Sequence, residues 1–180
     1  MRDKLETTWD AGGPYERFVG RWSRLVASAF LAWLAVPAGR SWADVGCGTG
    51  ALTESILTQC APNAVIGIDR SEAFVAEARR HSTDAPVRFQ VGDATALPLD
   101  AATCDVTVSG LVLHFVSDPP AMAREMFRVT KPGGTVAAYV WDYVGGMEML
   151  RFFWDAAVAV SPQDTQMDQA ERFRCANRHL

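Results

Sequence analysis

The sequence lacks several features that mark whole classes of protein. No run of about 18 apolar residues is present, so no membrane-spanning helix is expected. The four cysteines form no C-x-x-C pair and have no metal-ligand spacing, so we expect free thiols and no metal site. The amino-terminal residues Met-Arg-Asp-Lys-Leu-Glu lack the apolar core of a signal peptide. Together these absences favour a cytoplasmic protein.

Positive charge is also scarce. Lysine and arginine together number 17 against 21 acids, which gives a net charge of -4. Nucleic acids and anionic membranes call for clustered cations, so neither is expected as the main partner. The length of 180 residues and the hydrophobic share of 49% suit one globular α/β domain.

The order of apolar patterns predicts an α/β fold. Residues 15–34 repeat apolar positions with a helical period, and Pro37 and Gly39 end that pattern. Strand and helix patterns then alternate, which implies a parallel sheet with crossover helices. The expected strands are 41–45, 65–69, 87–91, 104–113 and 135–141, and the expected helices are 51–60, 72–81 and 119–129.

A glycine-rich loop follows the first predicted strand. The stretch Trp42-Ala-Asp-Val-Gly-Cys-Gly-Thr-Gly50 alternates glycines, which permit positive φ angles and let a ligand approach the backbone. Gly46, Gly48 and Ala51 also fit the G-x-G-x-x-G/A spacing of a dinucleotide site. Asp44 would repel a pyrophosphate but would accept a hydrogen bond from an ammonium group. The loop therefore favours an amino-acid-bearing cofactor over NAD.

The motif Asp44-Val-Gly-Cys-Gly-Thr-Gly50 resembles the D/E-x-G-x-G-x-G signature of class I S-adenosylmethionine-dependent methyltransferases. Gly92-Asp-Ala-Thr-Ala-Leu-Pro98 and Lys131-Pro-Gly-Gly134 extend the resemblance to the ubiquinone/menaquinone-type small-molecule group. The resemblance implies a Rossmann-like, doubly wound sheet in the order 3-2-1-4-5. It also implies S-adenosyl-L-methionine as cofactor, bound by Asp44, Gly46, Cys47, Gly48, Gly50, Asp69, Arg70, Asp93, Ala94, Ser109, Gly110, Tyr15 and Arg17.

Two acids at strand ends have specific roles in this resemblance. Asp69 ends the second strand nineteen positions after Gly50, near the spacing at which a carboxylate binds ribose hydroxyls. The alternative is that Asp69 caps the helix beginning near Ser71. Asp93 would accept a hydrogen bond from the adenine amino group. The alternative is that Asp93 only forms a hydrogen bond with its own backbone in a turn.

Two further predictions concern the mouth of the site. His114 follows the fourth strand and is the one candidate general base, although packing in an apolar segment is an alternative role. Tyr15 and Arg17 on the first helix resemble residues that close over the cofactor in this family. Packing of Tyr15 and Trp22 in the apolar stripe is the alternative.

The carboxyl-terminal part departs from the family pattern. Five strands are readable, whereas the family adds an antiparallel hairpin of strands six and seven. Residues 146–160 have a helical apolar stripe, but 161–180 are polar and cannot finish the sheet. We expect either a truncated enzyme or a second copy or partner that covers the exposed sheet edge. The expected division is a helical cap over 1–40, a cofactor-binding core over 41–145, and a helix with a polar tail over 146–180 that belongs to a truncated substrate lid.

The sequence thus predicts methyl transfer from S-adenosylmethionine to an oxygen, nitrogen or carbon of a small-molecule acceptor. Two alternatives remain open. One is an NAD-dependent oxidoreductase that uses the same loop, and the other is a non-catalytic adenosylmethionine-binding module.

Overall fold

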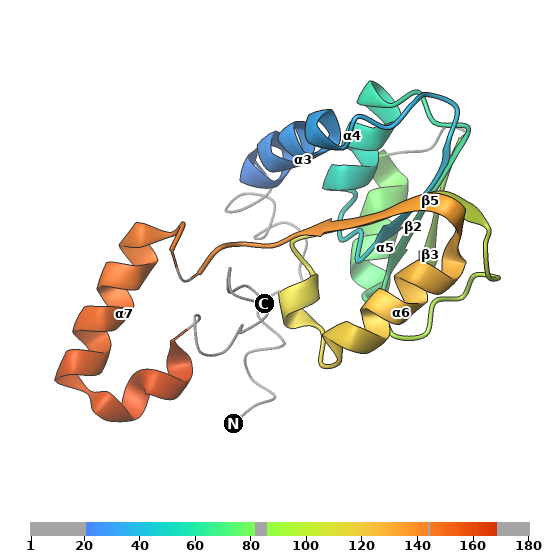
Figure 1. The fold of residues 1–180 in the computed structure, drawn as a ribbon. Coiled ribbons are helices and arrows are strands. Elements are labelled where there is room, and N and C mark those ends of the chain that lie inside the picture. Colours follow the sequence, from blue (N-terminus) through green and yellow to red (C-terminus); the bar gives the residue numbers. More distant parts are fainter. Residues whose placement is uncertain (1–20, 82–85, 144, 169–180) are drawn as a thin grey trace.

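The computed structural model describes residues 21–81, 86–143 and 145–168 (Figure 1). Five parallel strands form one sheet in the order β3-β2-β1-β4-β5, which confirms the predicted fold class and strand order. The strands are β1 (Ser41–Val45), β2 (Ala64–Asp69), β3 (Val87–Val91), β4 (Cys104–Gly110) and β5 (Thr130–Tyr139). The helices are α3 (Arg21–Leu34), α4 (Ala51–Gln59), α5 (Glu72–His81), α6 (Pro119–Val129) and α7 (Glu148–Val160), with 3-10 turns η3 (Leu113–Phe115) and η4 (Pro162–Met167).

Alternation along the strands builds two hydrophobic layers. Side chains of successive strand residues point to opposite faces of a sheet. Trp42, Val65 and Val106 pack with residues of α3 and α4 on one face. Ala43 and Ile66 pack with residues of α6 on the other face. The central strands β1, β2 and β4 are buried on both faces because helices cover both, whereas most residues of the edge strands β3 and β5 are exposed or half-buried.

Two strand boundaries differ from the sequence prediction by three residues or more. β4 ends at Gly110 rather than at residue 113, because Leu111 has a φ of 62° and leaves the extended conformation. β5 begins at Thr130 rather than at residue 135. Cys104 pairs with Thr130 and Val106 with residue 135, so the predicted turn Lys131-Pro-Gly-Gly134 is an irregularity inside the strand.

The last helix lies outside the two layers. α7 contains no buried residue, and Figure 1 shows it beyond the end of β5, away from the sheet. The 3-10 turn η4 folds back on it, so the described part of the predicted polar tail has local helical structure. Within the described ranges, no helix has the length and apolarity needed to cross a lipid bilayer.

Candidate cofactor site

The glycine-rich loop joins β1 to α4 at the carboxyl ends of the strands. Gly46, Gly48 and Gly50 have φ angles of 76°, 54° and 98°, and Gly50 is the residue that precedes the helix. A left-handed backbone disfavours any side chain with a Cβ. The alternating glycines therefore let the chain reverse within five residues and turn directly into α4.

The glycines face different surroundings. A Cβ on Gly46 would lie 2.6 Å from the methyl carbons of Val112, so the segment after β4 packs directly against the loop. A Cβ on Gly48 would meet no atom within 4 Å. Gly48 thus leaves open space beside the loop, where a ligand can approach the backbone.

Asp44 lies under the loop rather than at its surface. Its side chain is 1% exposed, and one oxygen, Oδ2, accepts a hydrogen bond of 2.6 Å from the Thr53 hydroxyl of α4. The other oxygen, Oδ1, is enclosed and has no hydrogen-bond partner in the described part of the chain. Burial raises the pKa of Asp44 to about 7 against the lowering effect of Thr53, and the Asp69 carboxylate raises it further.

Asp69 connects the loop to the next helix. Its Oδ2 accepts from the backbone N–H of Gly48 at 2.9 Å, and its Oδ1 accepts from the backbone N–H of Ser71 at 2.8 Å. Burial raises the pKa of Asp69, although both backbone bonds act in the opposite direction. The bond to Ser71 is the helix-start contact that the sequence left as an alternative. Each oxygen keeps a second lone pair for a ligand hydroxyl.

Asp93 and Arg70 lie in the same region as Asp69. Asp93 is exposed after β3, and its Oδ1 accepts from the backbone N–H and the hydroxyl of Thr95, each at 2.8 Å. These bonds are those of the turn alternative, and they lower the pKa of Asp93. The charge of Arg70 acts on both Asp69 and Asp93, so the three residues share one region. Ala94, half-buried, packs against the α6-side core.

Ser109 and Gly110, at the end of β4, lie on opposite faces of the sheet. Ser109 is fully buried, and its hydroxyl has no hydrogen-bond partner in the described residues. Strand alternation places it on the α6 face, whereas Asp44 bonds to α4 on the opposite face. The backbone of Gly110 is covered by Tyr139, whose hydroxyl oxygen would lie 2.5 Å from an added Cβ. The structure therefore places the Ser109 side chain on the opposite face from Asp44, whereas Gly110 lies on the same face as Asp44.

Two other predicted residues are enclosed. Cys47 is 6% exposed, and burial raises the pKa of its thiol. His114 lies in η3 with its ring centroid 4.0 Å from that of Phe115 and 5.5 Å from that of Tyr143. Burial lowers the pKa of His114 to about 4, so the imidazole is a weak base. This environment favours the packed alternative for His114. Tyr15 and Arg17 lie outside the described residues.

Sequence reasoning missed Thr53. Its hydroxyl donates a hydrogen bond from α4 to Asp44, and its side chain is 0% exposed. The available signal was position: Thr53 stands three residues after Gly50, in the first turn of a helix whose inner face must meet β1.

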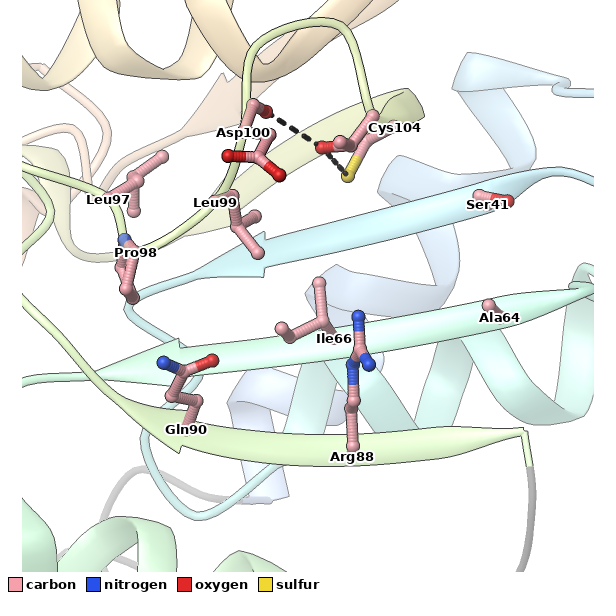
Figure 2. Close-up of a pocket in the computed structure, with 11 residues that line it drawn as sticks. Ser41, Ala64, Ile66, Arg88, Gln90, Leu97, Pro98, Leu99, Asp100 and Cys104 are labelled. Carbon is pink, nitrogen blue, oxygen red and sulfur yellow. Dashed lines mark hydrogen bonds between the residues drawn. The ribbon is translucent and has the colours of Figure 1, made fainter.

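A surface hollow of about 670 Å³ lies elsewhere. Figure 2 shows Ile66, Arg88 and Gln90 pointing from β2 and β3 toward the segment 97–104. Ser41 and Ala64, at the amino-terminal ends of their strands, also line it. None of the predicted cofactor residues does, so this hollow is separate from the glycine-rich loop.

Comparison with known proteins identifies the family. A family model described as a methyltransferase domain matches residues 43–138, which is more than half of the chain. The chain therefore belongs to the methyltransferase domain family. S-adenosylmethionine is the cofactor of this domain, and the family membership favours it over the nicotinamide alternative.

Particular relatives resemble the chain over part of their length. The demethylmenaquinone methyltransferase of Symbiobacterium thermophilum is 34% identical over 137 residues, which cover 73% of this chain and 54% of the relative. The structure also resembles the S-adenosylmethionine-dependent methyltransferase of Mesorhizobium loti with a TM-score of 0.55 and 30% identity, over 61% of this chain and 50% of that one.

A third match is a methyltransferase solved in complex with a Haloferax volcanii methyltransferase activator. It has a TM-score of 0.69 and 25% identity, over 93% of this chain and 74% of that one. The chain spans between about a third and just over half of the length of the first curated relatives.

The residues present fit this cofactor. The open space beside Gly48 suits a ligand in backbone contact, and Asp44 Oδ1 is a buried acceptor that lacks a donor. An ammonium group is a donor of the required charge. The vicinal hydroxyls of a ribose suit the remaining lone pairs of Asp69.

Proposed function

We propose that this domain transfers a methyl group from S-adenosylmethionine to a small-molecule acceptor. The observation that carries the proposal is the pair of acids on either side of an open glycine loop: Asp69, bonded to the Gly48 N–H, and Asp44, with its unpaired oxygen. The cofactor, when bound, supplies a methyl group on a sulfonium, which is already an activated leaving group.

The residues of the chain would bind and orient. Asp44 would accept a hydrogen bond from the amino-acid part of the cofactor, Asp69 from the ribose and Asp93 from the adenine. The backbone of Gly46, Gly48 and Gly50 would lie against the bound cofactor. Because orientation alone contributes about 7–11 kcal/mol to such reactions, no protein nucleophile is required.

The acceptor class rests on the relatives. The demethylmenaquinone methyltransferase of Symbiobacterium thermophilum acts, by its name, on a quinone. We propose an apolar small-molecule acceptor of comparable kind, held in part by the segment 146–180 as a lid. Exposed Phe152 and Phe153 of α7 support this segment as an apolar wall.

The test is formation of S-adenosylhomocysteine by the full chain incubated with S-adenosylmethionine and a panel of reduced naphthoquinones, phenols and carboxylic acids. We expect acceptor-dependent product with at least one apolar member, and none from Gly48→Val, whose side chain would fill the open space beside the loop. Cofactor binding without turnover on any acceptor would support the non-catalytic module instead.

We also propose that the outer edge of β5 pairs with a second copy or with a partner chain. β5 is the last strand of the sheet and pairs with β4, and its other edge has no strand beside it in the described residues. Unpaired strand edges associate readily. Light scattering on the purified chain tests this: a dimeric mass or co-purifying polypeptide is expected, and a clean monomer would contradict it.

A further inference from the structure

Thr53 and Asp44 form a closed pair between α4 and β1. The Thr53 hydroxyl donates to Asp44 Oδ2 at 2.6 Å, and the two side chains are 0% and 1% exposed. A buried hydrogen bond to a carboxylate is short and strong because no water competes for either group. It fixes the rotation of the carboxyl group, since one of its two oxygens is held.

The second oxygen has a different environment. Asp44 Oδ1 is enclosed without a hydrogen-bond partner in the described residues. The groups that act on this carboxyl are the Thr53 hydroxyl and backbone N–H and the Asp69 carboxylate, and no cation is among them in the described chain. Both oxygens of Asp69, by contrast, accept backbone N–H bonds. A buried acceptor that lacks a donor is costly, so such groups are rare unless a ligand completes them.

We propose that Thr53 is a positioning residue: it holds Asp44 Oδ2, so that Asp44 Oδ1 receives the α-ammonium group of S-adenosylmethionine. This inference rests on the proposed function and assigns a role to a residue that never touches the cofactor. Thr53 acts only through Asp44, so its effect is restricted to ligands that carry the ammonium group.

The proposal predicts proton release on binding. Because the pKa of Asp44 is raised to about 7, the carboxyl is mostly protonated at pH 6. A cation at Oδ1 favours the carboxylate, lowers that pKa and displaces the proton. Asp69, whose pKa is also raised, would contribute equally with any ligand that carries the ribose.

The experiment compares S-adenosylhomocysteine with 5′-methylthioadenosine, which has the same nucleoside but no ammonium group. Calorimetry at pH 8 measures both affinities for the wild type, Thr53→Val and Thr53→Ser. We expect Thr53→Val to weaken S-adenosylhomocysteine about tenfold, the effect of losing one hydrogen bond to a charged group, and to leave 5′-methylthioadenosine within about twofold. Thr53→Ser keeps the hydroxyl and should retain most of the affinity.

Equal losses for both ligands would overturn the proposal, because Thr53 would then act on the loop as a whole. Unchanged affinity for S-adenosylhomocysteine in Thr53→Val would overturn it as well. In both cases the wild type still binds, so the proposed function stands. A wild type that binds neither ligand would overturn both the proposed function and this inference.

A second measurement needs no variant. Calorimetry of the wild type at pH 6 in buffers of different ionisation enthalpy gives the number of protons released. We expect close to one more proton with S-adenosylhomocysteine than with 5′-methylthioadenosine. Equal proton release for the two ligands would contradict a role of Asp44 at the ammonium group, even if Thr53→Val fails to fold.

Discussion

The loop between β1 and α4 differs from helix α7 in burial and in its bonds to the rest of the domain. Around the loop, polar groups are buried and bonded inside the fold: Asp44 to Thr53, and Asp69 to two backbone N–H groups. α7 contains no buried residue, and its Arg151 bonds at 2.6 Å to Asp168, the residue that follows η4. The difference indicates that the glycine loop is held in place by bonds within the sheet domain, whereas α7, which we propose as part of the acceptor site, has no buried residue in the described part of the chain.

The largest expected effect comes from the loop. Gly46→Val places a branched side chain at a φ of 76° and within 2.6 Å of Val112. Left-handed strain of about 1–2 kcal/mol and overpacking of about 1–3 kcal/mol should together lower the free energy of unfolding by about 3–4 kcal/mol. Urea denaturation measures it. Gly48→Ala is the control, because it has similar backbone strain and no clash. Equal losses in the free energy of unfolding for the two variants would mean that Val112 moves aside without cost.

The pH dependence of stability is the next effect. The folded pKa of Asp44 lies above its unfolded value of 3.8, so between pH 5 and 7 the folded state holds a proton that the unfolded state has lost. Stability from Asp44 therefore falls as pH rises toward 7 and is constant above it. Asp44→Asn removes this dependence. As the pH rises from 5 to 8, the free energy of unfolding of Asp44→Asn should therefore increase by about 3 kcal/mol relative to that of the wild type. Thermal unfolding across this range measures it, and parallel curves for the two proteins would contradict a raised pKa.

A smaller effect is expected for Asp69. Asp69→Ala should weaken S-adenosylhomocysteine binding by about 1.5–3 kcal/mol, as for other hydrogen bonds to charged groups. It also removes the acceptor for the Gly48 N–H. Glu72→Ala is the control, since Glu72 is an exposed acid in the first turn of α5. Calorimetry on both variants measures the difference, and equal affinities would remove Asp69 from the site.

The smallest effect is expected on α7. Phe152 is 70% exposed, so Phe152→Ala should change the free energy of unfolding by less than about 0.5 kcal/mol. Phe30→Ala in α3, where the side chain is 7% exposed, should cost about 3–5 kcal/mol. Urea denaturation of both variants compares the two regions, and a cost at Phe152 near that at Phe30 would mean that α7 packs against the domain.

Sequence patterns predicted the elements better than the contacts of the site. The helices and strands follow from apolar periodicity, because burial imposes a clear apolar pattern on the central strands and on one face of each helix. The strand order was predicted from the resemblance to the methyltransferase family. The ends of β4 and β5 could not be predicted, since they depend on the conformation of Leu111 and on the pairing of Thr130. Thr53 was missed because its position in the first turn of α4 indicates that it faces β1 but does not indicate which side chain of β1 it bonds.

The separation of Asp44 from Ser109 was also beyond the sequence. Both residues lie near the carboxyl ends of neighbouring strands. Asp44 pairs with Val108, so the side chains of these two residues share one face of the sheet, and Ser109, the next residue, projects from the other face. A shift of one residue changes the face of a strand side chain. The motifs predicted that both residues bind the cofactor, whereas the strand register places their side chains on opposite faces of the sheet.

The decisive measurement is calorimetric titration of the purified full chain with S-adenosylhomocysteine, with NADH in parallel. A glycine loop held in place within the sheet domain predicts saturable binding of S-adenosylhomocysteine at micromolar concentration and weaker or no binding of NADH. Binding of NADH alone, or of neither ligand, would contradict the claim that the loop, Asp44 and Asp69 form a complete site for S-adenosylmethionine.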